Sequence, residues 1–411
     1  MKKKVLIHSL IFSPDGVSTA YLYNDIALSF QKKGYDVVVL STTPHYNVVE
    51  EQLAKQVITW RLPGFCKQSV YNGIRVYHVP QKKFKSTFLR LLGFIYWHIV
   101  SFFIGLFIKN VDVIISPSPP LTIGVINILL AKLKGAKVIY NVQEIYPDIL
   151  NKKNGVVVSF LKKIERFVYN SSNAVTTIDQ VFYDIIKPRF EDSTKLHIIP
   201  NFVDTELYKP NCSVESLDQT YFPKSNAIKL MYAGNVGFAQ DWVPLVELAK
   251  RIKHLPVEFF VIGEGVMKSY LEESIKAFDL KSIHLIPYQK RDLMPNLLAY
   301  SDIQFIFMHP EMDRQGFPSK TYTVMSCGKP LLVLSGDDTP IVNFLKPYDC
   351  AKLITNRDLS TKVNEMVEFL STVSRDELKK MGDNGVEVIT KYYSKEIVTS
   401  QYIDIVTKLL S

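Results

Sequence analysis

The stretch VDVIISPSPPLTIGVINILLAKLKGAKVIYNV, residues 111–142, contains the repeating unit that decides the fold. Its apolar run at 111–116 predicts a strand, residues 121–134 predict a helix, and residues 138–142 predict a second strand. Gly135, directly after the helical segment, is the expected stop signal. Strands that are apolar throughout and joined by a helix are typical of a parallel sheet covered on both faces.

The same alternation continues in both directions along the chain. A second series of strands begins near residue 225, and the segment 198–226 between the two series is rich in Pro, Asn and Ser. We therefore expect an α/β protein with two doubly wound domains, 1–200 and 201–390, that face each other across a ligand-binding cleft. The further predicted strands are 5–7, 37–40, 74–79, 174–178, 229–233, 257–262, 283–286, 303–308 and 331–334.

Composition excludes several classes of protein. Of the 411 residues, 47% are hydrophobic and 22% are charged, which is typical of packed domains and excludes disorder as the main state. The four cysteines, Cys66, Cys212, Cys327 and Cys350, show no CxxC spacing. This pattern favours a reduced cytosolic protein over a disulfide framework or a zinc site. The apolar start is interrupted at His8, which indicates a strand and not a signal peptide.

The positive charge is concentrated near the amino terminus. Residues 1–115 carry 14 Lys and Arg against 6 Asp and Glu, whereas the remaining 296 residues carry 35 against 34. An electrostatic partner therefore meets the first quarter of the chain. Nucleic acid is not expected, because the basic excess adjoins an apolar segment and forms no basic, aromatic-lined groove.

That apolar segment, residues 88–108, has one charged residue in 21 and is long enough as a helix to cross a bilayer. A span is not expected, because the strands on either side of it belong to one sheet. Two interpretations stay open: a buried crossover helix, or a helix on the membrane surface within a segment 82–109. The predicted membrane contacts are Lys82, Lys83, Lys85, Arg90 and the interface-seeking Trp97.

Three strand ends carry glycines where a diphosphate could approach the backbone. The turn after the first strand contains Gly16, but it does not match GxGxxG, so a nicotinamide site is not expected. In the second domain, Gly234, Asn235 and Gly237 follow one strand. Gly263 and Glu264 follow the next one, and ordinary turn chemistry is the alternative for each group.

The segment HPEMDRQGFPSKTYTVMSCGKP, residues 309–330, is the most informative. A polar loop leads to Ser319 and Lys320 at a predicted helix start. There Ser319 is expected to cap the helix, and Lys320 adds a cation beside free N–H groups, a combination that suits a phosphate. The alternative is a capped helix with a solvated lysine.

Two carboxylates follow the predicted strand 138–142. Glu144 and Asp148 lie in the sequence NVQEIYPDI, at the end of the strand that would face the cleft. Either one could orient or deprotonate an acceptor hydroxyl. The alternative is a pair of surface or helix-start carboxylates.

With these motifs in order, the sequence resembles bacterial glycosyltransferases of family 4, which have the two-domain GT-B fold. The resemblance rests on residues 13–47, 138–150, 198–210, 230–242, 261–273, 297–310 and 317–336, and is strongest to the capsule, O-antigen and colanic-acid group, which includes fucosamine-transferase-like enzymes. It implies a retaining, metal-independent transfer from a nucleotide-diphosphate sugar, with UDP expected, to a saccharide on undecaprenyl diphosphate at the cytoplasmic membrane face. It also implies a carboxy-terminal helix, 391–411, that returns to the first domain.

The resemblance implies donor contacts in the segment 309–330. Many family members carry two glutamates eight positions apart there, and alignment places Gln315 and Thr323 at those positions. Asn235 likewise stands near the position at which family members often carry a phosphate-binding Arg. Lys320 thus becomes the leading phosphate ligand, with Glu311 a possible replacement acid. The other implied donor contacts in the segment are Gly316, Phe317, Pro318 and Ser319.

Two other functions stay open from the sequence. A nucleotide-sugar epimerase of the same fold would need no membrane segment. A non-catalytic membrane-associated partner would explain the missing acidic pair.

Overall fold

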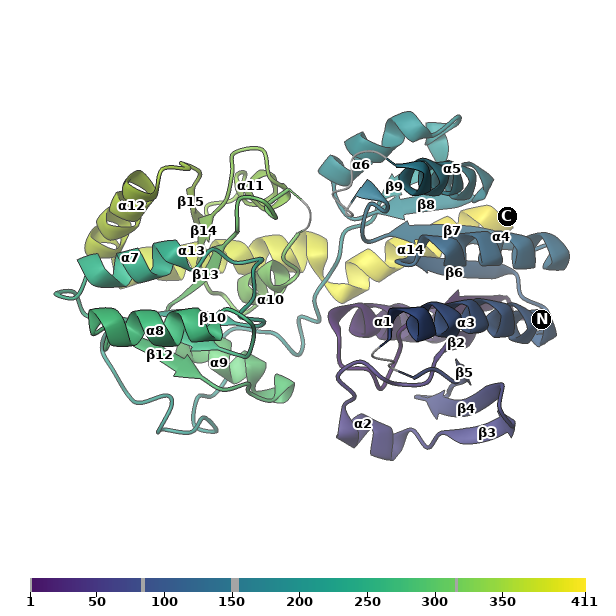
Figure 1. Ribbon diagram of the computed structural model, residues 1–411, viewed down its shortest axis with the longest axis horizontal. Helices are drawn as coiled ribbons and strands as arrows, with labels where there is room; N and C mark the ends of the chain where they lie inside the picture. The colour runs from purple at the N-terminus through teal and green to yellow at the C-terminus, as the bar shows by residue number, and fades with distance from the viewer. Residues whose placement is uncertain (1, 83–85, 149–154, 315–316) are drawn as a thin grey trace. The chain divides into compact units, whose positions relative to one another are not determined.

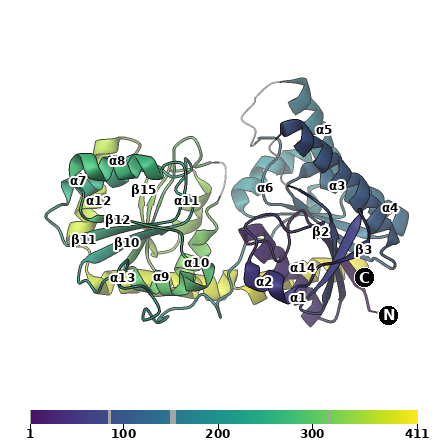
Figure 2. The same ribbon diagram turned by 60° about the horizontal axis from the view of Figure 1, so that its bottom comes forward.

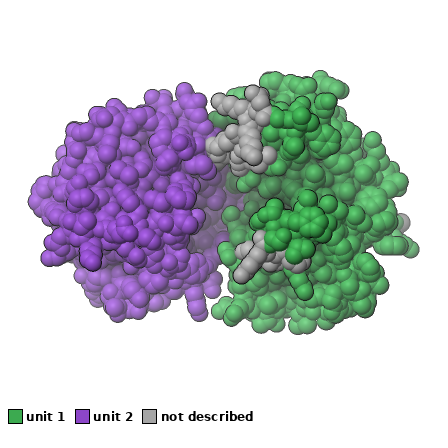
Figure 3. Space-filling model, viewed as in Figure 1, with its two compact units in different colours: residues 1–201, 395–411 green, residues 202–394 purple. Residues whose placement is uncertain are grey.

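The computed structural model describes residues 2–82, 86–148, 155–314 and 317–411. The chain divides into two compact units (Figures 1 and 3). Unit 1 consists of Met1–Asn201 and Lys395–Ser411, and unit 2 of Phe202–Ser394. The first unit therefore takes its last helix from the far end of the chain.

The sheet of unit 1 has nine strands within the described residues, in the order β3-β4-β5-β2-β1-β6-β7-β8-β9. The strands from β5 to β9 pair in parallel, whereas β3 and β4 form an antiparallel hairpin at one edge. The sequence prediction missed this hairpin. The strands are β1 (Lys4–His8), β2 (Asp36–Thr42), β3 (Thr59–Leu62), β4 (Cys66–Tyr71), β5 (Ile74–Val79), β6 (Val113–Ser118), β7 (Lys137–Val142), β8 (Ala174–Thr177) and β9 (Leu196–Ile198).

Helices cover both faces of this sheet (Figure 2). On one face α3, α4 and α5 lie side by side, and on the other α14 packs against α1. Buried strand side chains such as Leu6 and Ile114 are fully covered as a result. The helices of unit 1 are α1 (Ser18–Lys32), α2 (Glu50–Lys55), α3 (Thr87–Phe107), α4 (Leu121–Lys134), α5 (Val156–Ser171), α6 (Gln180–Ile186) and α14 (Lys395–Leu410).

Unit 2 has a second parallel sheet, in the order β12-β11-β10-β13-β14-β15 within the described residues. The order reverses at β10, which lies between β11 and β13. A reversal of this kind leaves a crevice at the carboxyl ends of the two central strands, where doubly wound sheets bind ligands. The strands are β10 (Ile228–Ala233), β11 (Val257–Ile262), β12 (Ile283–Ile286), β13 (Ile303–Phe307), β14 (Leu331–Leu334) and β15 (Ala351–Ile354).

The helices of unit 2 also form two layers. One layer holds α7 between α8 and α12, and the other includes α10 against α13. The helices are α7 (Val243–Arg251), α8 (Lys268–Phe278), α9 (Met294–Tyr300), α10 (Lys320–Ser326), α11 (Pro340–Leu345), α12 (Leu359–Thr372) and α13 (Arg375–Val388). A π-helix at Ile389–Tyr393 follows α13 and precedes α14.

The segment predicted as a connection, 198–226, is mostly packed onto unit 2. Leu217 and Phe222 are buried against Met231 and Phe260 of its sheet. The segment thus contributes to the core of unit 2 and is not a free linker.

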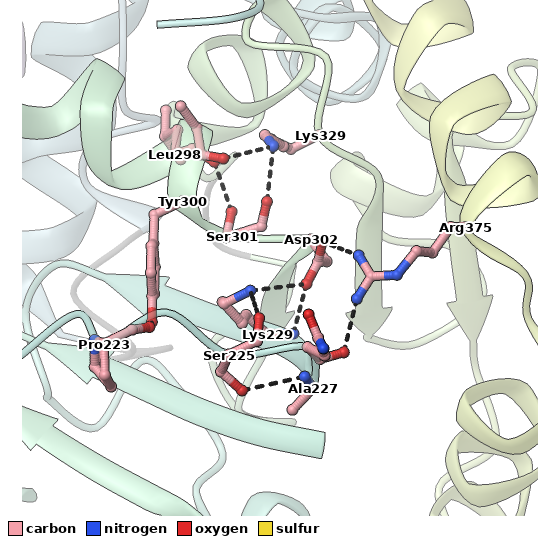
Figure 4. A network of polar contacts seen from close by, with 12 residues as sticks. Pro223, Ser225, Ala227, Lys229, Leu298, Tyr300, Ser301, Asp302, Lys329 and Arg375 are labelled. Carbon is pink, nitrogen blue, oxygen red and sulfur yellow. Dashed lines mark hydrogen bonds and ion pairs between the residues drawn. The ribbon is translucent and has the colours of Figure 1, made fainter. Parts of the chain in front are cut away.

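Polar contacts hold the end of this segment (Figure 4). Asp302 accepts from the backbone N–H of Lys229 and pairs with Arg375 at 3.1 Å. Arg375 also donates to the carbonyl of Asn226, and Tyr300 donates to that of Pro223. These contacts surround the amino ends of β10 and β13, opposite the carboxyl ends at which doubly wound sheets bind ligands.

Candidate active site

Two loops of unit 2 meet at the carboxyl ends of β10 and β13. The N–H of Asp241, after β10, donates to the carbonyl of Phe307 at 2.7 Å. The N–H of His309, after β13, donates to the carbonyl of Ala239 at 3.0 Å. The glycine-containing loop 234–241 and the start of the segment 309–330 are therefore held together by backbone hydrogen bonds.

Lys320 reaches this place from the first residue of α10. Its Nζ lies 3.6 Å from the ring centroid of Tyr232 and donates to the carbonyl of Ala233 at 3.0 Å. Among the described residues, Lys320 forms no ion pair. A cation over an aromatic face is attracted by the ring quadrupole, but this contact does not replace a full counter-ion. The side chain is thus a positive charge held in place and only partly compensated.

Burial lowers the pKa of the Lys320 ammonium to about 7, since desolvation disfavours the charged form. An anion bound beside Nζ would raise this pKa again by favouring the charged form. The site is therefore suited to a ligand that brings negative charge.

Gly234 leaves space for this lysine, and Gly263 lets the backbone of the next strand end pack against Gly234. A Cβ on Gly234 would lie 2.8 Å from the Nζ of Lys320, and a Cβ on Gly263 would lie 1.9 Å from the carbonyl oxygen of Gly234. Their φ angles are +152° and +139°, a region that side chains rarely adopt. The two predicted glycines therefore lie side by side at the ends of β10 and β11.

The other predicted residues of these two loops have separate roles. The backbone carbonyl of Asn235 accepts from the Tyr232 hydroxyl at 2.8 Å, while the residue itself is exposed. The carbonyl of Gly237 accepts from Trp242 Nε1 at 3.1 Å. Glu264 is exposed and pairs with Lys268 at 2.8 Å.

The segment that leads into α10 is only partly described, since the predicted donor contacts Gln315 and Gly316 lie outside the described residues. Phe317 packs against Tyr322, with ring centroids 5.1 Å apart, and Pro318 is half-buried beside it. The Thr323 hydroxyl donates to the carbonyl of Lys320 at 2.8 Å, within the helix.

The expected cap at Ser319 was wrong. Ser319 is the N-cap residue of α10, but its side chain makes no capping hydrogen bond, because its backbone is already helical, with φ −56° and ψ −23°. A capping side chain normally comes from a residue with extended backbone.

Asp313 anchors the same segment, a role that the sequence analysis did not predict. Its carboxylate is buried, pairs with Arg357 at 2.6 Å and accepts from the N–H of Gly336 at 3.0 Å. These partners lie in the turns after β15 and β14. Nothing in the local sequence around Asp313 could have indicated partners more than 20 residues away.

In unit 1, the Gly16 N–H is engaged within the protein. It donates to the carbonyls of Tyr46 and Asn47 at 3.1 and 3.0 Å. The neighbouring Asp15 accepts from the N–H groups of His45 and Tyr46. The turn at Gly16 is therefore tied to the loop that follows β2.

Glu144 and Asp148 lie after β7 in different surroundings. Burial raises the pKa of Glu144, which is half-buried and forms no ion pair among the described residues. Asp148 pairs with Arg189 at 2.5 Å and with Lys162 at 3.6 Å. Of the two carboxylates, Glu144 is thus the one available for a proton-transfer role.

The apolar segment forms α3, the one helix in the described residues that is long and apolar enough to cross a membrane by length and composition. It connects β5 to β6 of the same sheet, and only 22% of its most apolar stretch is buried. The segment is therefore a crossover helix with one buried face, and most of its apolar stretch is not buried. The exposed side chains include Phe88, Leu92, Ile95, Ile99 and Phe103.

The prediction for Trp97 was wrong. Its side chain is fully buried and contacts His98, with ring centroids 4.7 Å apart. At about 100° per residue, Trp97 lies on the face of α3 opposite Ile95 and Ile99. Arg90 and Lys82 are exposed, whereas Lys83 and Lys85 lie outside the described residues.

The two units match two family models. Residues 20–207 match the model described as Glycosyltransferase Family 4, and residues 214–387 match Glycosyl transferases group 1. With two parallel-sheet units and a cationic site at the strand ends of the second, the protein is a glycosyltransferase of the GT-B fold. The chain belongs to glycosyltransferase family 4, as the resemblance implied.

Solved structures support the fold. Sucrose-phosphate synthase from Thermosynechococcus elongatus superposes with a TM-score of 0.75 at 11% identity, covering 99% of both chains. Anabaena HepE in complex with UDP superposes with a TM-score of 0.73 at 13% identity, covering 99% of this chain and 100% of its own.

Curated relatives are similar over most of their length. WcaI of Escherichia coli (strain K12), described as a glycosyl transferase of colanic acid biosynthesis, is 23% identical over 79% of this chain and 81% of its own. An E. coli UDP-Gal:alpha-D-GlcNAc-diphosphoundecaprenol alpha-1,3-galactosyltransferase is 23% identical over 69% of this chain and 73% of its own.

Proposed function

We propose that this glycosyltransferase moves a sugar from a UDP-linked donor to a saccharide on a polyprenyl diphosphate, with retention at the anomeric carbon and without a metal ion. The product would belong to a bacterial surface polysaccharide. The observation that carries the proposal is the ammonium of Lys320, which is held over Tyr232 beside Gly234 without a counter-ion among the described residues.

The chemistry of the leaving group explains why such a lysine matters. As the bond between the sugar and the diphosphate breaks, negative charge develops on the diphosphate oxygens. A fixed cation in a water-poor site stabilises that charge without reorganisation, which is often the largest catalytic term. Gly234 leaves room for the diphosphate to approach the same nitrogen. The lysine thus supplies the charge that a divalent cation provides in other transferases.

The acceptor half rests on Glu144 and on the relatives. A half-buried carboxylate with a raised pKa is suited to position or deprotonate an acceptor hydroxyl. One relative carries diphosphoundecaprenol in its name, and one structural neighbour holds UDP. These names support the nucleotide and the class of acceptor proposed.

A lipid-linked acceptor implies a place at the membrane. The exposed apolar side chains Phe88, Leu92, Ile95, Ile99 and Phe103 fall within an arc of roughly 80° on α3. A stripe of this kind lets a helix lie in the interface, with anionic lipids attracting nearby lysines and arginines. We place the enzyme peripherally on the cytoplasmic face, with α3 against the bilayer.

A two-stage experiment tests the function. A thermal-shift screen with UDP-glucose, UDP-galactose, UDP-GlcNAc and GDP-mannose comes first, since a bound donor raises Tm by mass action. The donor that binds is then incubated with and without polyprenyl-diphosphate saccharides, in the presence of EDTA. Transfer that requires the acceptor supports the proposal. A change in the donor sugar without any acceptor would indicate an epimerase, and failure to bind any nucleotide a non-catalytic partner.

A further inference from the structure

A long stretch of unit 1 contains no acidic residue. Between Glu51 and Asp112 there are nine Lys and Arg and not one Asp or Glu. This stretch includes α3, but it also includes the β3–β4 hairpin at the edge of the sheet. The positive charge of this stretch is complementary to an anionic surface along its whole length, and it would repel a positively charged partner.

The hairpin is joined to α3 at the middle of the helix. The Tyr96 hydroxyl donates to the carbonyl of Gly64, in the hairpin turn, at 2.6 Å. On the opposite flank of the exposed stripe, His98 bonds to Thr122 of α4 at 2.8 Å. The stripe on α3 therefore lies between α4 on one side and the hairpin on the other.

The hairpin exposes large apolar side chains beside this junction. Leu62 and Phe65, on either side of Gly64, are 55% and 51% exposed. Trp60 is 52% exposed, and the Nζ of Lys67 lies 4.7 Å from its ring centroid. An edge strand with such side chains in water is an aggregation hazard unless something covers it. Aromatic rings beside lysines are what a headgroup region accommodates.

We propose that the β3–β4 hairpin is a second membrane-binding element, which inserts Trp60, Leu62 and Phe65 into an anionic bilayer surface beside α3. This inference rests on the proposed membrane location of α3 and extends it to a separate part of the fold. Two elements that contact one surface also fix the rotation of unit 1 about the axis of α3, which a single helix does not.

Tryptophan fluorescence reports on the hairpin alone. The chain has three tryptophans, and Trp97 and Trp242 are 0% and 2% exposed, so Trp60 is the one in contact with water. Full-length protein is titrated with vesicles of phosphatidylcholine and phosphatidylglycerol, or of phosphatidylcholine alone. We expect a blue shift and protection from acrylamide with the anionic vesicles, and neither change in the Trp60→Phe variant.

Sedimentation with the same vesicles separates this inference from the proposed function. The variant Leu62→Ser/Phe65→Ser should bind anionic vesicles about tenfold or more weakly, because two apolar side chains are lost from the interface. The matched control Ile185→Ser/Leu207→Ser removes side chains that are 42% and 51% exposed elsewhere, and should bind normally. Unchanged melting temperatures show that both variants fold.

The outcomes distinguish the two ideas. Vesicle binding with no change in Trp60 fluorescence and no effect of the hairpin variant would overturn the hairpin proposal and leave α3 as the membrane contact. Binding to neither vesicle would overturn the membrane location of α3 as well. Equal binding to both vesicle types would overturn the role assigned to the basic residues.

Discussion

The ammonium of Lys320 lies 3.6 Å from the ring centroid of Tyr232, at the carboxyl end of β10. The lysine comes from α10 and the tyrosine from the central strand of the sheet, so the contact joins the two elements that form the candidate donor site. Replacing Lys320 with Ala should lower kcat/KM roughly 30- to 150-fold. This corresponds to a loss of about 2–3 kcal/mol of transition-state stabilisation, because the charge on the leaving group is no longer compensated.

Steady-state kinetics with saturating acceptor measure this loss. Lys329→Ala is a matched control, because Lys329 is also a half-buried lysine, just past the other end of α10, and donates to the carbonyls of Ala299 and Ser301. That variant should lower Tm and leave donor affinity unchanged. Near-normal turnover in Lys320→Ala would remove this residue from the mechanism.

Donor binding should depend on pH through the same group. With a pKa of about 7 in the free site, Lys320 is largely neutral at pH 8.5. A bound diphosphate favours the charged form, so binding takes up a proton. UDP-glucose affinity should therefore fall roughly 10- to 30-fold between pH 6.5 and 8.5. Calorimetry in two buffers of different ionisation enthalpy measures the proton uptake directly, and Lys320→Ala should show none.

Gly234→Ala should impair donor binding, because the new Cβ crowds Lys320 and because the backbone at this position is strained for any residue with a side chain. The new Cβ would meet the Nζ of Lys320 at 2.8 Å, whereas a Cβ on Gly64 meets nothing within 4 Å. Both glycines have positive φ, so each variant should lose about 1 kcal/mol or more of stability. Only Gly234→Ala should weaken UDP binding, by about tenfold or more. Equal UDP affinities in the two variants would contradict this role for Gly234.

Substitutions of Glu144 and Asp148, the two carboxylates after β7, should affect different properties of the enzyme. Glu144→Gln should reduce kcat roughly 100-fold or more at unchanged donor affinity, as loss of a general base does. Asp148→Asn breaks the pair with Arg189, which also pairs with the buried Glu165. Its main effect should therefore be a lower Tm. Donor Kd, kcat and thermal melts on both variants test the assignment, and the reverse pattern would transfer the catalytic role to Asp148.

Acid should destabilise unit 1 through two buried histidines. Burial lowers the pKa of His8 and of His78 to about 4, against 6.5 in the unfolded chain. Between these values the unfolded state binds more protons, so stability is full above pH 6.5 and falls as pH decreases toward 4. The slope is up to about 1.4 kcal/mol per pH unit for each histidine. Melts of the wild type and His78→Gln at pH 7.5 and 5.0 should show a smaller loss in the variant.

The sequence predicts those features of the molecule that depend on a short stretch of residues. The strand ends with Gly234 and Gly263, and the lysine at the start of α10, follow from short patterns of apolar and glycine residues. The partners that place Lys320 are not local: Tyr232 and Ala233 lie almost 90 residues away and meet it only because β10 and β13 are neighbours in the sheet.

A prediction from residue type alone was wrong where the position on the helix decides whether a side chain is buried. Trp97 has the side chain of an interface residue, but its place on the helix turns it into the core, where its ring lies against that of His8. Reading the period of α3 residue by residue would have separated Trp97 from Ile95 and Ile99. The β3–β4 hairpin has no strong alternation and was missed, although it carries the exposed Trp60.

The return of α14 to unit 1 has a consequence for biosynthesis. The hydroxyl of Tyr402 on this helix accepts a hydrogen bond from Nδ2 of Asn141 in the middle of unit 1, and Val398 and Val406 are fully buried. A nascent chain that has emerged as far as Asn201 lacks this cover. At 5–20 residues per second, the ribosome needs roughly 10–40 s to add unit 2 and α14. During that interval the face of α1 that α14 covers stays open, so the half that is synthesised first is completed last.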